Sequence, residues 1–243
     1  MVKNPLPTPT SPRERAILDW IARAGVVDFD RLVNRFFREE HETLLVASPR
    51  AEAALKRLVF KGYLNARPLA VDGAKAATTG NPNPLARHYV LRAYCLTPRT
   101  SRSLGLPLPP KLRENFIEHH LKTLDALANI ERQQLAVGNR VLGFRMETQI
   151  MRDDFQGKDF RGRAAAARTQ EVISKLPDAQ LTLQRPDGTV EQVNVEYVSA
   201  KYSDQMIREK ATAWRGLSTV WAVPNQATAA RVLSVTGQPA VLV

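Results

Sequence analysis

Apolar residues in the first sixty positions recur every three or four residues, which is the spacing of one helix face. This pattern predicts three helices, at about 12–24, 28–36 and 48–61. Ser11, Asp28 and Ser48 stand at their starts, where a side-chain oxygen can accept a backbone N–H. Gly25 and Gly62 favour the ends of the first and third helices.

Two segments with strand-like content follow these helices, at 63–71 and 87–96. The loop between them, 72–86, is rich in Gly, Asn, Pro and Thr. Three helices, a strand, a loop and a strand are the order of a winged helix-turn-helix, whose last helix enters the major groove of duplex DNA. The basic residues on that helix and beside the wing loop are therefore DNA-binding candidates: Arg50, Lys56, Arg57, Lys61, Lys75 and Arg87.

The charge distribution also favours a nucleic-acid partner. Residues 1–110 contain 17 Lys/Arg and 9 Asp/Glu, a net charge of +8, whereas residues 111–243 contain 18 and 15, a net charge of +3. A basic excess concentrated in one part of a chain is an electrostatic footprint of nucleic-acid binding. The alternative is that these side chains only keep the surface soluble.

The second half of the chain follows a boundary marked by three prolines in 106–110. We expect a winged-helix domain over 1–106, a connector helix within 107–138 and a second domain over 139–243. The connector has apolar residues at helical spacing from 111 to 135, and it could mediate a homodimer or pack against the second domain.

The second domain is predicted to be an α/β domain with a mixed sheet. A strand over 140–150 contains Glu147, and a hairpin joins strands at 177–183 and 192–198. A helix at 203–214, a strand at 218–223, a helix at 226–234 and a strand at 240–243 complete it. The charged stretch 152–166 is expected to be a loop that touches phosphates through Lys158, Arg161 and Arg163.

These features in this order resemble the replication-relaxation family of plasmids and mobile elements. The resemblance is carried by the winged helix, the connector, Glu147, the pair Pro177-Asp178, the strand 195–198 and the lysine-containing helix that ends in Trp214. It covers nearly the whole chain with short motifs. It implies a winged helix joined to a domain similar to the PD-(D/E)xK restriction-endonuclease fold.

That fold uses two acids at adjacent strand ends to hold Mg²⁺ or Mn²⁺, which activates water at a phosphate, and a lysine that positions the nucleophile. Asp178 and Glu196 match the two acids, and Glu147 is a further candidate. The lysine expected two residues after Glu196 is replaced by Val198. Lys201 and Lys210 are the candidate substitutes. The departure favours a nuclease-like domain that is not catalytic and needs no cofactor.

The sequence gives little support for a zinc site or for a membrane-spanning segment. A single cysteine and four histidines give no Cys/His group at zinc spacing. No apolar run approaches a membrane span of about 20 residues, and the first ten residues lack the apolar core of a signal peptide. We therefore expect a cytoplasmic protein without a membrane partner.

Three hypotheses remain. The first is a double-stranded-DNA-binding accessory or regulatory protein of a plasmid or mobile element, acting with replication or transfer proteins. The second is a metal-dependent DNA endonuclease using Asp178 and Glu196. The third is a dimeric transcriptional repressor, for which a symmetric dimer through 111–135 would be the mark.

Overall fold

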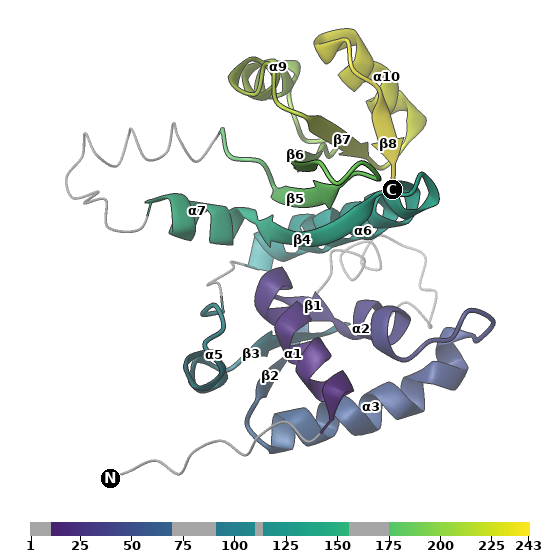
Figure 1. The fold of residues 1–243 in the computed structure, drawn as a ribbon, viewed down its shortest axis with the longest axis vertical. Helices are drawn as coiled ribbons and strands as arrows, with labels where there is room; N and C mark the ends of the chain where they lie inside the picture. Colours follow the sequence, from purple (N-terminus) through teal and green to yellow (C-terminus); the bar gives the residue numbers. More distant parts are fainter. Residues whose placement is uncertain (1–10, 70–90, 110–113, 156–174) are drawn as a thin grey trace, which may run out of the picture. The chain divides into compact units, whose positions relative to one another are not determined.

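The computed structural model describes residues 11–69, 91–109, 114–155 and 175–243 (Figure 1). The chain divides into two compact units, Met1–Glu118 and His119–Val243. The division falls inside helix α6 (Glu114–Ala136), so most of the expected connector helix belongs to the second unit. The wing loop 72–86 with Lys75, and also Arg87, Lys158, Arg161 and Arg163, lie outside the described residues.

The first unit combines helices with a small antiparallel sheet. Its helices are α1 (Pro12–Ala24), α2 (Phe29–Phe36), α3 (Leu44–Phe60) and α5 (Pro98–Leu104), and its strands are β1 (Val27–Asp28), β2 (Leu64–Leu69) and β3 (Leu91–Leu96). The strand order is β1-β3-β2, so the short strand between α1 and α2 pairs with β3 rather than with its neighbour in sequence. The sequence pattern missed β1 because two residues are too few to show an alternation.

The predicted starts of α1 and α2 are confirmed. Ser11 accepts a hydrogen bond from the backbone N–H of Glu14 at 3.1 Å, and Asp28 accepts one from the N–H of Arg31 at 3.0 Å. Gly25 ends α1 with a φ of 83°, a conformation that L side chains rarely adopt. These local contacts involve residues close in sequence, which is why the pattern alone revealed them.

The start of α3 was predicted wrongly. The helix begins at Leu44, one turn before Ser48, and Pro49 lies inside it. Pro49 lacks the N–H that would reach the Leu45 carbonyl, so its cost is one hydrogen bond near the helix N-terminus. The extra turn buries Ala47 completely, and the Ser48 hydroxyl donates to the Leu44 carbonyl at 2.6 Å. Packing and this local bond therefore stabilise a turn that the Ser-Pro signal had excluded.

The second unit contains a five-stranded mixed sheet, as the sequence predicted. After α6 come β4 (Arg140–Met146), α7 (Glu147–Phe155), β5 (Ala179–Gln184), β6 (Val190–Tyr197), α9 (Asp204–Ala213), β7 (Thr219–Val223), α10 (Gln226–Thr236) and β8 (Ala240–Leu242). The strands lie side by side in chain order from β4 to β8 (Figure 1). The first three are antiparallel, and β7 and β8 join parallel to β6 through α9 and α10.

Glu147 does not lie in a strand, contrary to the prediction. The strand ends at Met146, and Glu147 is the first residue of α7, so residues 152–155 are also helical rather than part of a loop. The side chain of Gln149 accepts from the backbone N–H of Met146 at 3.2 Å, which is half of a capping box. This capping by glutamine starts a helix where the apolar pattern favoured a longer strand.

The core of the second unit forms around the central strand β6. Residues 193–198 are all buried, because helices or strands cover both faces of this part of the sheet. Val198 is inaccessible to solvent and packs in a cluster with Ile207, Trp214, Trp221, Val223 and Val232. The residue in the position of the expected lysine is therefore a core residue.

We predict that Val198→Lys lowers the free energy of unfolding by about 3–5 kcal/mol, the range found when a buried charge lacks a partner. Val198→Met is the matched control, because it introduces an uncharged chain of similar length at a cost of about 1–3 kcal/mol from overpacking. Urea unfolding followed by tryptophan fluorescence measures both. Equal losses in the two variants would show that the charge itself is tolerated there.

Candidate polar site of the second unit

The two predicted acids meet at one end of the β5–β6 hairpin. Asp178 lies directly before β5, and the pairing of Ala179 with Val195 places it beside Glu196. The backbone N–H of Asp178 donates to Glu196 Oε2 at 3.2 Å, and the N–H of Tyr197 donates to Asp178 Oδ2 at 2.8 Å. The hairpin register therefore brings both carboxylates together at the same end of the hairpin.

Lys210, and not Lys201, is the lysine that reaches these acids. Its Nζ lies 2.5 Å from Glu196 Oε1 and donates to the Leu176 carbonyl at 3.0 Å. It occupies the same face of α9 as the core residues Ile207 and Trp214, three and four positions away. Lys201 is exposed, and its side chain makes no hydrogen bond or ion pair with a described residue.

His119 joins the site from α6, which the sequence did not suggest. Its Nε2 lies 2.9 Å from Asp178 Oδ2. The imidazole ring stacks on Tyr202 at 6.2 Å between centroids and meets the edge of Tyr197 at 5.5 Å. Tyr202 in turn donates its hydroxyl to Glu196 Oε1 at 2.8 Å. The sequence shows a histidine within an apolar helical stretch, but only the folded structure shows that its partner is Asp178.

Burial and mutual charge set the protonation of this cluster. Burial and the neighbouring Asp178 raise the pKa of Glu196 to about 7, even though Lys210 and Tyr202 oppose the shift. Burial acts in the same direction on Asp178, but the charge and hydrogen bond of His119 outweigh it and lower the pKa of that carboxyl. One carboxylate is thus held ionised, while the other is close to taking up a proton.

The two basic side chains of the cluster also have shifted pKa values. Burial disfavours the charged forms of His119 and Lys210, but the adjacent carboxylates outweigh it and raise both pKa values. Glu147 lies near the cluster, where burial and the charge of Asp178 raise its pKa. The result is a compact set of two acids and two bases in which the charges largely cancel.

This donor set does not fit a divalent cation. Mg²⁺ and Ca²⁺ require several oxygen ligands with free lone pairs. Both oxygens of the fully buried Glu196 already accept from Lys210, Tyr202 and Asp178, and Asp178 Oδ2 accepts from two donors. Within the described ranges, no three His, Cys, Asp or Glu side chains are grouped as metal ligands. The Lys210 ammonium itself supplies the positive charge that a cation would bring.

The DNA-binding candidates of the first unit differ in the ion pairs and hydrogen bonds that their side chains make. Lys56 and Arg57 are exposed on α3, with Lys56 2.9 Å from Glu52, and Arg57 makes no ion pair with a described residue. Arg50 is paired with Glu42 and donates to the Phe37 carbonyl at 2.7 Å. Lys61 lies 3.6 Å from the buried Glu14.

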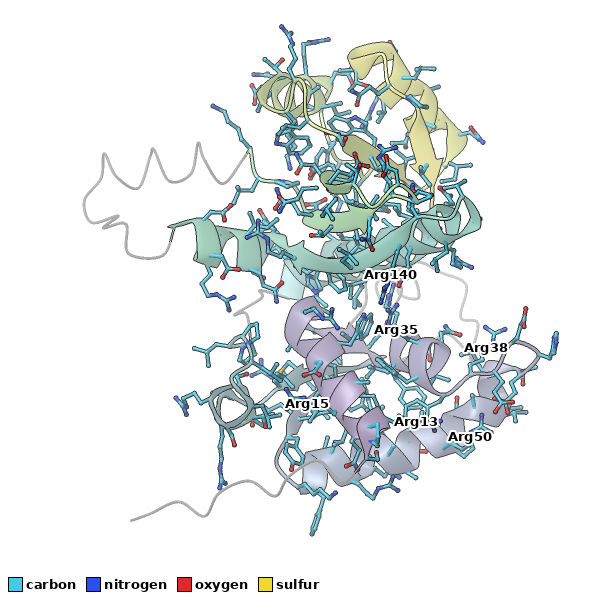
Figure 2. All side chains as sticks on the ribbon, in the orientation of Figure 1. Arg13, Arg15, Arg35, Arg38, Arg50 and Arg140 are labelled. Atoms are coloured by element: carbon cyan, nitrogen blue, oxygen red, sulfur yellow. The ribbon has the colours of Figure 1, made fainter. Side chains whose placement is uncertain are left out.

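Figure 2 shows Arg38 and Arg50 beside the segment between α2 and α3. Arg38 donates to the carbonyl of Glu42 and to the side chain of Asn34, at 2.7 and 3.0 Å. Together with the Arg50–Glu42 pair, these bonds hold the segment between α2 and α3. Arg50 and Arg38 are therefore structural as well as exposed, which makes them poor single probes of ligand binding.

Comparison with protein-family models, with curated proteins and with solved structures finds no match to this chain. In the part of the chain that the structure describes, no helix is both long enough and apolar enough to cross a bilayer.

We predict that His119→Gln destabilises the protein more at about pH 6 than at about pH 9. The folded state raises the pKa of His119 above its ordinary value of 6.5, so its ion pair with Asp178 contributes fully below that value. The contribution disappears as pH rises through the raised pKa. Urea unfolding of wild type and variant at both pH values gives the difference, and the exposed His41→Gln is the control. A penalty that does not change with pH would contradict the assignment.

Proposed function

We propose that this protein binds double-stranded DNA through α3 of its first unit, which acts as the recognition helix of a winged helix-turn-helix. The observation that supports this best is the combination of strand order and exposure. The sheet has the order β1-β3-β2, its strand β2 directly follows α3, and the outer face of α3 presents Lys56 and Arg57 to solvent. A basic exposed helix of this kind suits the major groove, about 12 Å wide.

The apolar residues on the same helix fit this role as well. Leu45, Val46 and Phe60 are 83%, 55% and 92% exposed, an unusual proportion for side chains of this type. In the major groove, apolar side chains contact the methyl group of thymine, while arginine and lysine contact guanine or phosphates. The helix thus offers both kinds of contact.

We propose further that the second unit is nuclease-like but not catalytic. The sheet has three antiparallel strands and then a parallel strand that is joined through a helix, and the acids lie at one end of the hairpin. This arrangement agrees with the restriction-endonuclease resemblance of the sequence. Lys210 neutralises Glu196 where an active enzyme would leave both groups facing substrate and metal. On this proposal the cluster stabilises a domain whose task is contact with DNA or with another protein.

The biological setting rests on the sequence resemblance alone. On this resemblance we propose an accessory or regulatory protein of a plasmid or similar element, acting in replication, transfer or their transcription. Its candidate partners are DNA and replication or transfer proteins, and a homodimer is compatible with these roles.

We predict that Lys56→Gln with Arg57→Gln weakens binding to duplex DNA and lowers the salt slope of log K by about 0.9 for each phosphate that the variant no longer neutralises. Fluorescence anisotropy with a labelled duplex, titrated at several salt concentrations, measures both quantities. Arg99→Gln with Arg102→Gln is the matched control, because it removes the same charge from exposed positions on α5.

Equal effects of the two double variants would mean that only net charge matters, and the assignment of α3 would fail. The original candidate Arg50 is left intact in this design, since its removal would also release Glu42.

A second candidate function, a metal-dependent nuclease, is favoured by one observation, the meeting of Asp178 and Glu196 at one end of the β5–β6 hairpin. On our proposal, incubation of the protein with supercoiled plasmid and either Mg²⁺ or Mn²⁺ leaves the DNA uncut. Gel electrophoresis detects nicking at low levels. Cleavage by the wild type that is abolished in Glu196→Gln would overturn the non-catalytic assignment and establish the nuclease.

A further inference from the structure

A hollow of about 300 Å³ lies in the second unit. It is formed by the C-terminal half of α9, the start of β7 and the end of α10, which are neighbours in Figure 1. Arg208 and Thr212 line it from α9, Arg215 follows that helix, Thr219 opens β7 and Gln238 follows α10. We call it the α9–α10 pocket.

The pocket is lined by hydrogen-bond donors and positive charge. Arg208 and Arg215 are both exposed, and neither side chain makes an ion pair or hydrogen bond with a described residue. None of the described residues that line the pocket is acidic. Gln238 accepts from Trp221 Nε1 at 2.7 Å through its oxygen, which leaves the amide N–H₂ group as a donor.

Two buried tryptophan rings form the base of the pocket. Trp214 and Trp221 are 6% and 1% exposed, and their ring centroids lie 5.7 Å apart. An apolar base lowers the local dielectric constant, which strengthens charge-assisted hydrogen bonds at the rim. The ends of α9 and α10 each contribute about half a unit of negative charge, and the two guanidinium groups exceed this with two full positive charges.

We propose that the α9–α10 pocket binds a phosphate group. Arginine is the side chain best suited to grip phosphate, because its planar fork donates two parallel hydrogen bonds. The phosphate can belong to a nucleic-acid backbone or to a free pyrophosphate or nucleotide. The site concerns only the second unit, so it stands independently of the role of α3.

The test compares two double variants of the full-length chain. Arg208→Gln with Arg215→Gln removes the proposed phosphate ligands. Lys122→Gln with Arg132→Gln removes the same charge from exposed positions on α6 and serves as the control. Each protein is titrated with a labelled DNA duplex over a range of salt, and separately with inorganic pyrophosphate while tryptophan fluorescence is recorded. Two of the three tryptophans form the base of the pocket.

If the pocket binds phosphates of the DNA backbone, the salt slope of duplex binding falls in the pocket variant by about 0.9 for each phosphate that the two arginines neutralised. The salt slope of the control variant then stays unchanged. For a free phosphate source, the duplex slopes agree, but the fluorescence response to pyrophosphate disappears only in the pocket variant. If both assays give the same result for the pocket variant and the control, the proposal is overturned. Should the wild type bind no duplex at all, the proposed DNA binding fails, and the pyrophosphate titration still decides the pocket.

Discussion

The ion pair between Glu196 and Lys210 is the interaction on which the second unit depends. Glu196 is completely buried and Lys210 is 8% exposed, so neither charge could be kept without the other. The pair joins the central strand β6 to α9, and the Lys210 bond to the Leu176 carbonyl adds the segment before β5. His119 extends the same network to α6 through Asp178. Four parts of the unit, β6, α9, the segment before β5 and α6, are thus joined around one pair of opposite charges.

This arrangement limits what the cluster can do chemically. A nuclease site needs carboxylate oxygens that are free for a cation and a lysine that is free for substrate. Here the oxygens of Glu196 accept from protein donors and the lysine neutralises the acid. In this structure these residues form a buried hydrogen-bonded network, in which burial raises the pKa of Glu196 and His119 lowers that of Asp178. Outward-facing cations lie on α3 and beside the α9–α10 pocket.

The first unit shows a similar separation of roles among its basic residues. Lys56 and Arg57 lie on the exposed face of α3, whereas Arg50 and Arg38 also hold the segment between α2 and α3, and Lys61 contacts the buried Glu14. The sequence presents all of them as equivalent positive charges. Their surroundings leave Arg57 without an ion pair to a described residue and Lys56 paired with Glu52 of the same helix, whereas the others are bonded to other parts of the fold.

The sequence by itself determined the features that depend on near neighbours along the chain. The caps at Ser11 and Asp28, the hairpin that joins the predicted strands 177–183 and 192–198, and the helices α1, α2, α9 and α10 were predicted, because their hydrogen bonds and apolar faces involve residues a few positions apart. It also named Asp178, Glu196 and Lys210. Only the tertiary structure decided that Lys210 rather than Lys201 meets the acids and that His119 joins them. It also decided that Val198 lies in the core. These outcomes depend on which strands and helices pack together, and such contacts between distant residues leave no periodic mark in the chain.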